Sequence, residues 1–176
     1  MRVFKGRELK ATKIFIIFCI AVFILQQLYP NSAFYFGLNL YFFKNLYLWQ
    51  PLSSMFMHGN LMHLAMNMAV LYQFGSLLER NLGTKNFTKL FIIGGFLTGI
   101  LSVLFLYIFN LNHLLVGASG AISVLIGLVA RHDVFNRKGL IIAILLISFA
   151  PLMLGVNIAW YAHLFGFIIG WFWKIK

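Results

Sequence analysis

Apolar residues occur in six long runs along this 176-residue chain, separated by polar segments. The runs cover residues 14–29, 61–78, 90–109, 114–130, 139–154 and 157–173. Each run has roughly 15 to 20 residues, and a helix rises ~1.5 Å per residue against a hydrocarbon core of ~30 Å. The pattern therefore predicts six transmembrane helices, several of them short for a full crossing.

The composition supports the membrane class. The chain is 62% apolar and only 10% charged, which lies far from the average of soluble domains. Its net charge is +11, but the basic residues form short clusters between apolar runs instead of one solvated face. We therefore predict an all-α integral membrane protein in a lipid bilayer, without a nucleic-acid partner. The single cysteine, Cys19, permits no intrachain disulfide.

The positions of the cations predict the orientation of the runs, because cytoplasmic loops are enriched in Lys and Arg. Six spans with both termini in the cytoplasm put thirteen of the fourteen cations on one side, and Lys44 is the exception. Residues 1–13 are then a basic cytoplasmic tail, and residues 174–176 are a second tail. No repeat or second domain is visible, so we expect one domain over 1–176.

The link over residues 30–60 lies on the outer side in this topology and is rich in aromatic residues. Aromatic side chains outside a span are typical of the membrane interface. We predict a structured loop lying partly in the outer leaflet. The alternative is an ordinary interfacial loop with no role in function.

All three acidic residues, Glu8, Glu79 and Asp133, fall on the cytoplasmic side in this topology. The outer side therefore lacks the carboxylates of an aspartyl protease, a His-Glu-x-x-His zinc protease or a Ser-His-Asp triad. Proton-coupled transport usually relies on a carboxylate within a span, and none is available for it here.

Four polar residues are predicted to converge at one depth below the outer surface. His63 and Asn67 lie one and two turns into the second run, and their spacing of four places them on one helix face. Ser119 lies about five residues into the fourth run, and His163 lies roughly 9 Å into the sixth. Each also has a structural interpretation: helix packing for Ser119, a satisfied histidine for His163 and interhelical hydrogen bonding for Asn67.

Small residues predict how two of these groups meet. Ser119, Ser123 and Gly127 form one stripe, Gly166 and Gly170 form another, and such stripes let membrane helices approach closely. If the stripes face each other, His163 comes within hydrogen-bond reach of Ser119. The glycine-rich start of the fourth run also favours a helix that begins late, below a wet cavity lined by Asn110, Asn112 and His113.

This set of residues can support a serine hydrolase without a carboxylate. His163 would act as the general base for Ser119, and no metal or other cofactor is required. The backbone N–H of Ser119 and the side chains of His63 and Asn67 are the candidate donors to an oxyanion. One alternative is a metal site or transporter that uses the histidines at positions 58, 63, 113 and 163.

The motifs at these positions resemble those of the rhomboid intramembrane serine proteases, in the order of that family over residues 49–170. They are Gly117-Ala118-Ser119-Gly120; His58 with His63 and Asn67; Ala162-His163 with Gly166 and Gly170; and Gly75, Glu79 and Gly83. The resemblance implies a six-helix rhomboid-like bundle that cleaves transmembrane segments of other membrane proteins. It implies Ser119 as nucleophile, His163 as base, and His63 and Asn67 as oxyanion donors.

The resemblance also implies that the loop over 30–60 is membrane-embedded and that the link from Pro151 to Asn157 is a movable cap. Relatives often carry an aromatic residue at the position of Ser123, so Tyr161 becomes the candidate for orienting His163. Gln50 stands where many relatives have a loop-anchoring arginine.

The alternative to an active protease is a catalytically inactive member of the family that binds transmembrane segments. With no transit segment before the first span, we expect the bacterial inner membrane; the oligomeric state stays open.

Overall fold

The computed structural model describes residues 9–153, 155 and 158–175, and the secondary structure in this part of the chain consists of helices and one isolated antiparallel bridge, joined by irregular links. Six long helices match the six apolar runs: α1 (Ala11–Leu28), α5 (Leu61–Leu82), α6 (Thr84–Ile108), α7 (Ser119–His132), α8 (Arg137–Met153) and α9 (Trp160–Phe172). The predicted loop contains α2 (Ser32–Phe36), α3 (Tyr41–Lys44), α4 (Gln50–Ser53) and the 3-10 helix η1 (Ser54–Phe56). The prediction of an all-α protein is confirmed.

Three of the described helices, α1, α5 and α6, are long and apolar enough to cross a membrane. Helices α7 and α9 are apolar but shorter, with 14 and 13 residues. At ~1.5 Å per residue they span about 20 Å, less than a ~30 Å hydrocarbon core. These apolar helices identify an integral membrane protein. Helices α7 and α9 are short, as the sequence predicts for several of the six helices.

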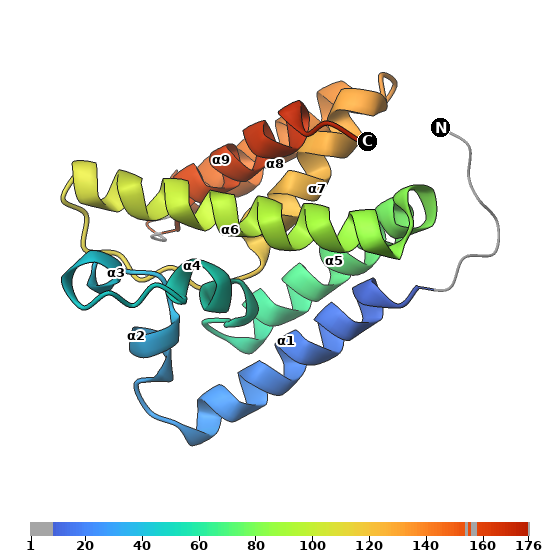
Figure 1. Ribbon diagram of the computed structural model, residues 1–176. Helices are drawn as coiled ribbons and strands as arrows, with labels where there is room; N and C mark the ends of the chain where they lie inside the picture. The colour runs from blue at the N-terminus through green and yellow to red at the C-terminus, as the bar shows by residue number, and fades with distance from the viewer. Residues whose placement is uncertain (1–8, 154, 156–157, 176) are drawn as a thin grey trace.

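The segments that carry most of the cations lie at one end of the molecule. In Figure 1 the start of α1, the α5–α6 turn, the α7–α8 turn and the end of α9 all lie toward the right. The short helices of the 30–60 loop lie at the opposite end (Figure 1). This arrangement agrees with the segregation of charge on which the predicted topology depends.

Helix α7 is enclosed by its neighbours. Every residue from Ala121 to Ala130 is buried, and α5, α6, α8 and α9 all contact this helix. A helix that is apolar on all sides suits such a central position. Its first turn is therefore held by the surrounding bundle.

Glu79 joins two helices at the end opposite the loop. Its carboxylate accepts hydrogen bonds from the backbone N–H groups of Lys10, Ala11 and Thr12 at 3.0, 2.9 and 2.9 Å. The hydroxyls of Thr12 and Thr84 also donate to it, at 2.7 and 2.9 Å. These N–H groups open α1, where they have no partner within their own helix and where negative charge is favourable. Glu79 therefore caps α1 from α5.

Two predicted boundaries need correction. Helix α8 continues through Pro151 to Met153, so the link predicted to start at Pro151 starts later. Helix α1 begins at Ala11, inside the predicted tail 1–13. The remaining cap residues 154, 156 and 157, and the tail residues 1–8 and 176, lie outside the described residues.

Candidate active site

Ser119 and His163 are brought together from α7 and α9. Ser119 is the first residue of α7, and His163 lies one turn into α9. Ser119 Oγ and His163 Nε2 are 3.0 Å apart, which is hydrogen-bond distance. Both side chains are half-buried. A hydroxyl at a helix start, next to an imidazole nitrogen, is an arrangement suited to nucleophilic chemistry.

Glycines make this approach possible. A Cβ on Gly166 would collide with the carbonyl oxygen of Gly120 and lie 3.0 Å from Ser123 Cβ. A Cβ on Gly170 would collide with the carbonyl oxygen of Val124. Helices α7 and α9 thus meet backbone to backbone. Of the two predicted stripes, Gly166 faces Ser123, whereas Gly170 faces the backbone of Val124.

The segment before Ser119 is fixed by the loop. Gly117 has a φ of +125°, a conformation that residues with a side chain rarely adopt, and its N–H donates to the carbonyl oxygen of Ser54 at 2.9 Å. Leu38 and Leu115 exchange two backbone hydrogen bonds of 2.9 Å. The predicted late start of the fourth helix is confirmed, since α7 begins at Ser119. The loop therefore positions the segment that leads to Ser119.

His63 and Asn67 lie beside this segment. A Cβ on Gly117 would lie 2.7 Å from both Cε1 and Nε2 of His63 and 3.6 Å from Nδ2 of Asn67. Asn60 caps α5 by accepting the backbone N–H of His63 at 2.8 Å, and Asn67 Nδ2 donates to the carbonyl oxygen of His63 at 3.1 Å. The structure thus places both side chains against Gly117, two residues before Ser119.

His58 lies behind His63 and is only 1% exposed. The two imidazole rings meet nearly edge to face, with centroids 5.3 Å apart. Gln26 of α1 holds the His58 backbone, because its amide donates to the His58 carbonyl oxygen at 3.1 Å and accepts from the His58 N–H at 3.0 Å. Burial lowers the pKa of His58 to about 4, so this ring is neutral near pH 7.

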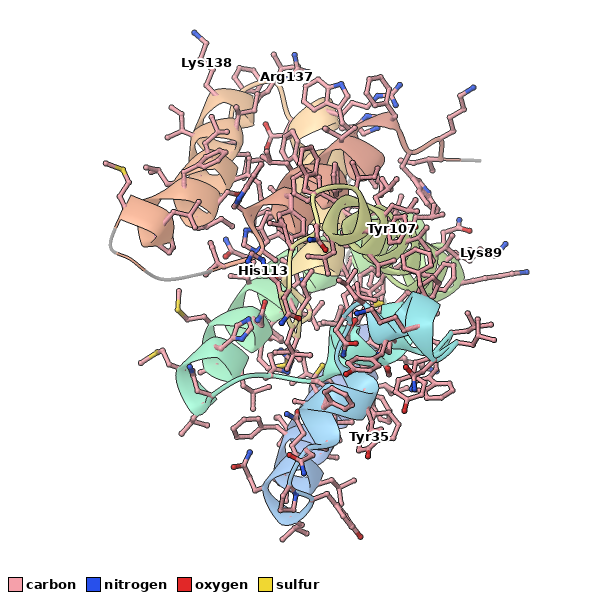
Figure 2. The ribbon with its side chains drawn as sticks, turned by 90° about the vertical axis from the view of Figure 1, so that its left-hand side faces the viewer. Tyr35, Lys89, Tyr107, His113, Arg137 and Lys138 are labelled. Atoms are coloured by element: carbon pink, nitrogen blue, oxygen red, sulfur yellow. The ribbon has the colours of Figure 1, made fainter. Side chains whose placement is uncertain are left out.

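A cavity of about 50 Å³ adjoins Ser119 and is large enough to admit water. Its other walls come from the loop, α6 and the start of α9, among them Pro51, Ser54, Gly95, Thr98, Gly99 and Ala159. Asn110, Asn112 and His113 do not line it, which corrects the sequence-based expectation. His113 instead lies near the centre of the view in Figure 2, which looks onto the end of the molecule that carries the 30–60 loop. Its Nδ1 is 3.4 Å from Tyr161 Oη.

Sequence reasoning also missed the role of α6. Glycines 94, 95 and 99 of α6 leave room for Val124, Met55 and Pro51 respectively, and an added Cβ on Gly99 would lie 2.9 Å from the Pro51 carbonyl oxygen. The spacing of small residues along α6 was a signal of this close packing.

Gln50 anchors the loop with a neutral amide. It is fully buried, donates to the carbonyl oxygens of Phe34 and Tyr35 at 3.3 and 3.4 Å, and accepts from the Asn39 N–H at 3.3 Å. These bonds satisfy a buried polar group. They anchor the loop at the position where the resemblance led us to expect an arginine.

Tyr161, the candidate for orienting His163, packs elsewhere. Its ring stacks on Phe105 with centroids 4.5 Å apart. His163 Nδ1 instead lies 3.4 Å from Ser148 Oγ, a contact that sequence reasoning did not find.

In the described part of the chain, no three His, Cys, Asp or Glu residues are grouped as metal ligands.

Comparison with known proteins gives the family. Residues 45–176 match the Rhomboid domain model. RHOMBOID-like protein 4 of Arabidopsis thaliana is 35% identical over 130 residues, which cover 69% of this chain and 32% of that protein. Rhomboid protease GlpG of Haemophilus influenzae is 25% identical over 187 residues, covering 98% and 93% of the two chains. GlpG of Serratia proteamaculans is 28% identical over 163 residues, covering 86% and 57%.

The chain thus spans about a third of the Arabidopsis relative and nearly all of the Haemophilus one. The resemblance seen in the motifs is confirmed by these matches. With the Rhomboid domain extending over most of its length, the chain belongs to the rhomboid family.

Proposed function

We propose that this rhomboid family member is an intramembrane serine endopeptidase that hydrolyses peptide bonds in or near transmembrane segments of other membrane proteins. The observation that carries this function is the 3.0 Å distance between Ser119 Oγ and His163 Nε2. The two GlpG relatives, which are named rhomboid proteases, support the same class of activity.

The proposed protease is one domain over residues 1–176, with six transmembrane helices and both termini in the cytoplasm. Its 30–60 loop lies in the outer leaflet. We also propose that it resides in the bacterial inner membrane. No metal or other cofactor takes part.

The proposed reaction runs on a dyad. His163 Nε2 accepts the proton of Ser119 Oγ as this oxygen attacks the carbonyl carbon of the scissile peptide. The protonated imidazole then gives this proton to the leaving amine, which leaves an ester on Ser119. A water molecule, deprotonated by His163, hydrolyses the ester and releases the new carboxylate.

The negative charge that develops on the carbonyl oxygen needs donors. The proposed donors are the backbone N–H of Ser119, at the positive end of α7, and the side chains of His63 and Asn67 beside Gly117. Preorganised donors of this kind stabilise the transition state more than the bound substrate.

Asn67→Ala is expected to lower kcat by about 10²- to 10³-fold with little change in KM, because it removes an oxyanion donor. The measurement is cleavage of a transmembrane reporter in proteoliposomes. Asn81→Ala is the matched control, since Asn81 also donates to the carbonyl four residues earlier in α5, at 2.6 Å. Equal losses in the two variants would assign Asn67 a helix-stabilising role instead.

A fluorophosphonate probe tests whether Ser119 is a nucleophile without any knowledge of the substrate. We expect a covalent adduct that maps to Ser119 by mass spectrometry, with labelling lost in His163→Ala. The alternative function, an inactive protein that binds transmembrane segments, predicts that such segments bind while Ser119 stays unlabelled.

A further inference from the structure

Helix α8 buries one polar side chain, and this side chain faces His163. Ile144 and Ser148 are the two buried residues of α8, and Ser148 is 0% exposed. Ser148 Oγ lies 3.4 Å from His163 Nδ1, at the long end of the hydrogen-bond range. The imidazole of His163 therefore lies between two serine hydroxyls, with Ser148 at Nδ1 and Ser119 at Nε2.

The hydrogen bonds of Ser148 determine the direction of this contact. Ser148 Oγ also lies 2.6 Å from the carbonyl oxygen of Ile144, and a carbonyl oxygen can only accept. The single hydroxyl proton therefore belongs to the bond with Ile144. Ser148 Oγ then offers His163 only lone pairs, so His163 must donate Nδ1–H.

The tautomer with a proton on Nδ1 has its lone pair on Nε2, which faces Ser119 Oγ at 3.0 Å. This is the tautomer that a general base for Ser119 requires. In a Ser-His-Asp triad, the aspartate selects the same tautomer and fixes the orientation of the ring. A neutral hydroxyl can do both, although it adds no charge to stabilise the imidazolium.

We propose that Ser148 is a positioning residue that holds His163 in the tautomer and orientation needed to act as base toward Ser119. This role rests on the proposed protease activity. Position 123, which carries an aromatic residue in many relatives, holds a serine whose hydroxyl donates to the Ser119 carbonyl oxygen at 2.8 Å. Ser148 thus supplies from α8 a contact to the base that Ser123 and Tyr161 do not provide.

A pair of variants separates this role from simple packing. Threonine keeps the hydroxyl, and valine has nearly the same shape without it, so any crowding is common to Ser148→Thr and Ser148→Val. We expect Ser148→Val to lower kcat by about 10- to 100-fold with KM nearly unchanged, as for other partners that fix a histidine tautomer, and Ser148→Thr to retain most of kcat. Equal kcat in the two variants would overturn the role.

A second measurement does not depend on catalysis. Protein labelled with ¹⁵N-histidine reports the tautomer of each imidazole by its nitrogen chemical shifts, and His163 is assigned by its absence in His163→Gln. We expect Nδ1–H in the unmodified protein and a shift toward Nε2–H in Ser148→Val, with the exposed His132 unchanged. An unchanged His163 tautomer in Ser148→Val would contradict the proposal. If the unmodified protein cleaves nothing, the protease function fails, and the tautomer still decides the role of Ser148.

Discussion

Replacing Ser119 or His163 by alanine is expected to lower the cleavage of a transmembrane reporter by roughly 10⁴- to 10⁶-fold. Ser119→Ala removes the atom that forms the acyl ester, and His163→Ala removes the base 3.0 Å from it. Because the two groups act as a unit, the double variant should be no slower than either single variant. Any remaining rate would come from binding and from the oxyanion donors.

Matched variants check that the loss is chemical. Ser76→Ala changes a serine of α5, and His132→Ala changes an exposed histidine at the end of α7. Both should keep the parent rate, and all four variants should unfold like the parent protein. The rates are measured with purified protein in proteoliposomes. Cleavage that persists in Ser119→Ala would contradict the proposed mechanism.

Much of the fold follows from the sequence, because hydrophobicity and helix period act locally. Each of the six apolar runs contains a helix, and the start of the fourth run, residues 114–118, lies outside α7. The contact between α7 and α9 was also predictable, since Gly166 and Gly170 recur at a spacing of four and both meet the backbone of α7, Gly166 at Gly120 and Gly170 at Val124. Once two stripes of this kind meet, the position of His163 relative to Ser119 is nearly determined.

Other features depend on how each helix is rotated about its axis, which an apolar run does not specify. Ser148 lies in a run that is apolar on all sides, so no period indicates that it faces His163. The contribution of α6 and the loop to the walls of the cavity could not be predicted for the same reason. The anchoring by Gln50 was missed because three backbone partners, distant in sequence, replace one charge.

Gly170→Ala is expected to separate α9 from α7 and so to inactivate the protein. The added Cβ would collide with the carbonyl oxygen of Val124 and lie 3.0 Å from the backbone nitrogen of Leu128. Backbone atoms in a buried helix cannot move aside as a flexible side chain can. Overpacking of this kind typically costs about 1–3 kcal/mol of unfolding free energy. A displacement of ~1 Å between reacting groups can itself lower the rate by ~10²-fold.

Gly139→Ala provides the matched control for this substitution. Gly139 is also a helical glycine, but no atom lies within 4 Å of an added Cβ. Alanine should therefore stabilise α8 by up to about 1 kcal/mol and leave the cleavage rate unchanged. Unfolding is followed by circular dichroism during denaturation in micelles, and cleavage is followed with the same reporter. If Gly170→Ala matched Gly139→Ala in both measurements, close contact between α7 and α9 would not be what brings His163 to Ser119.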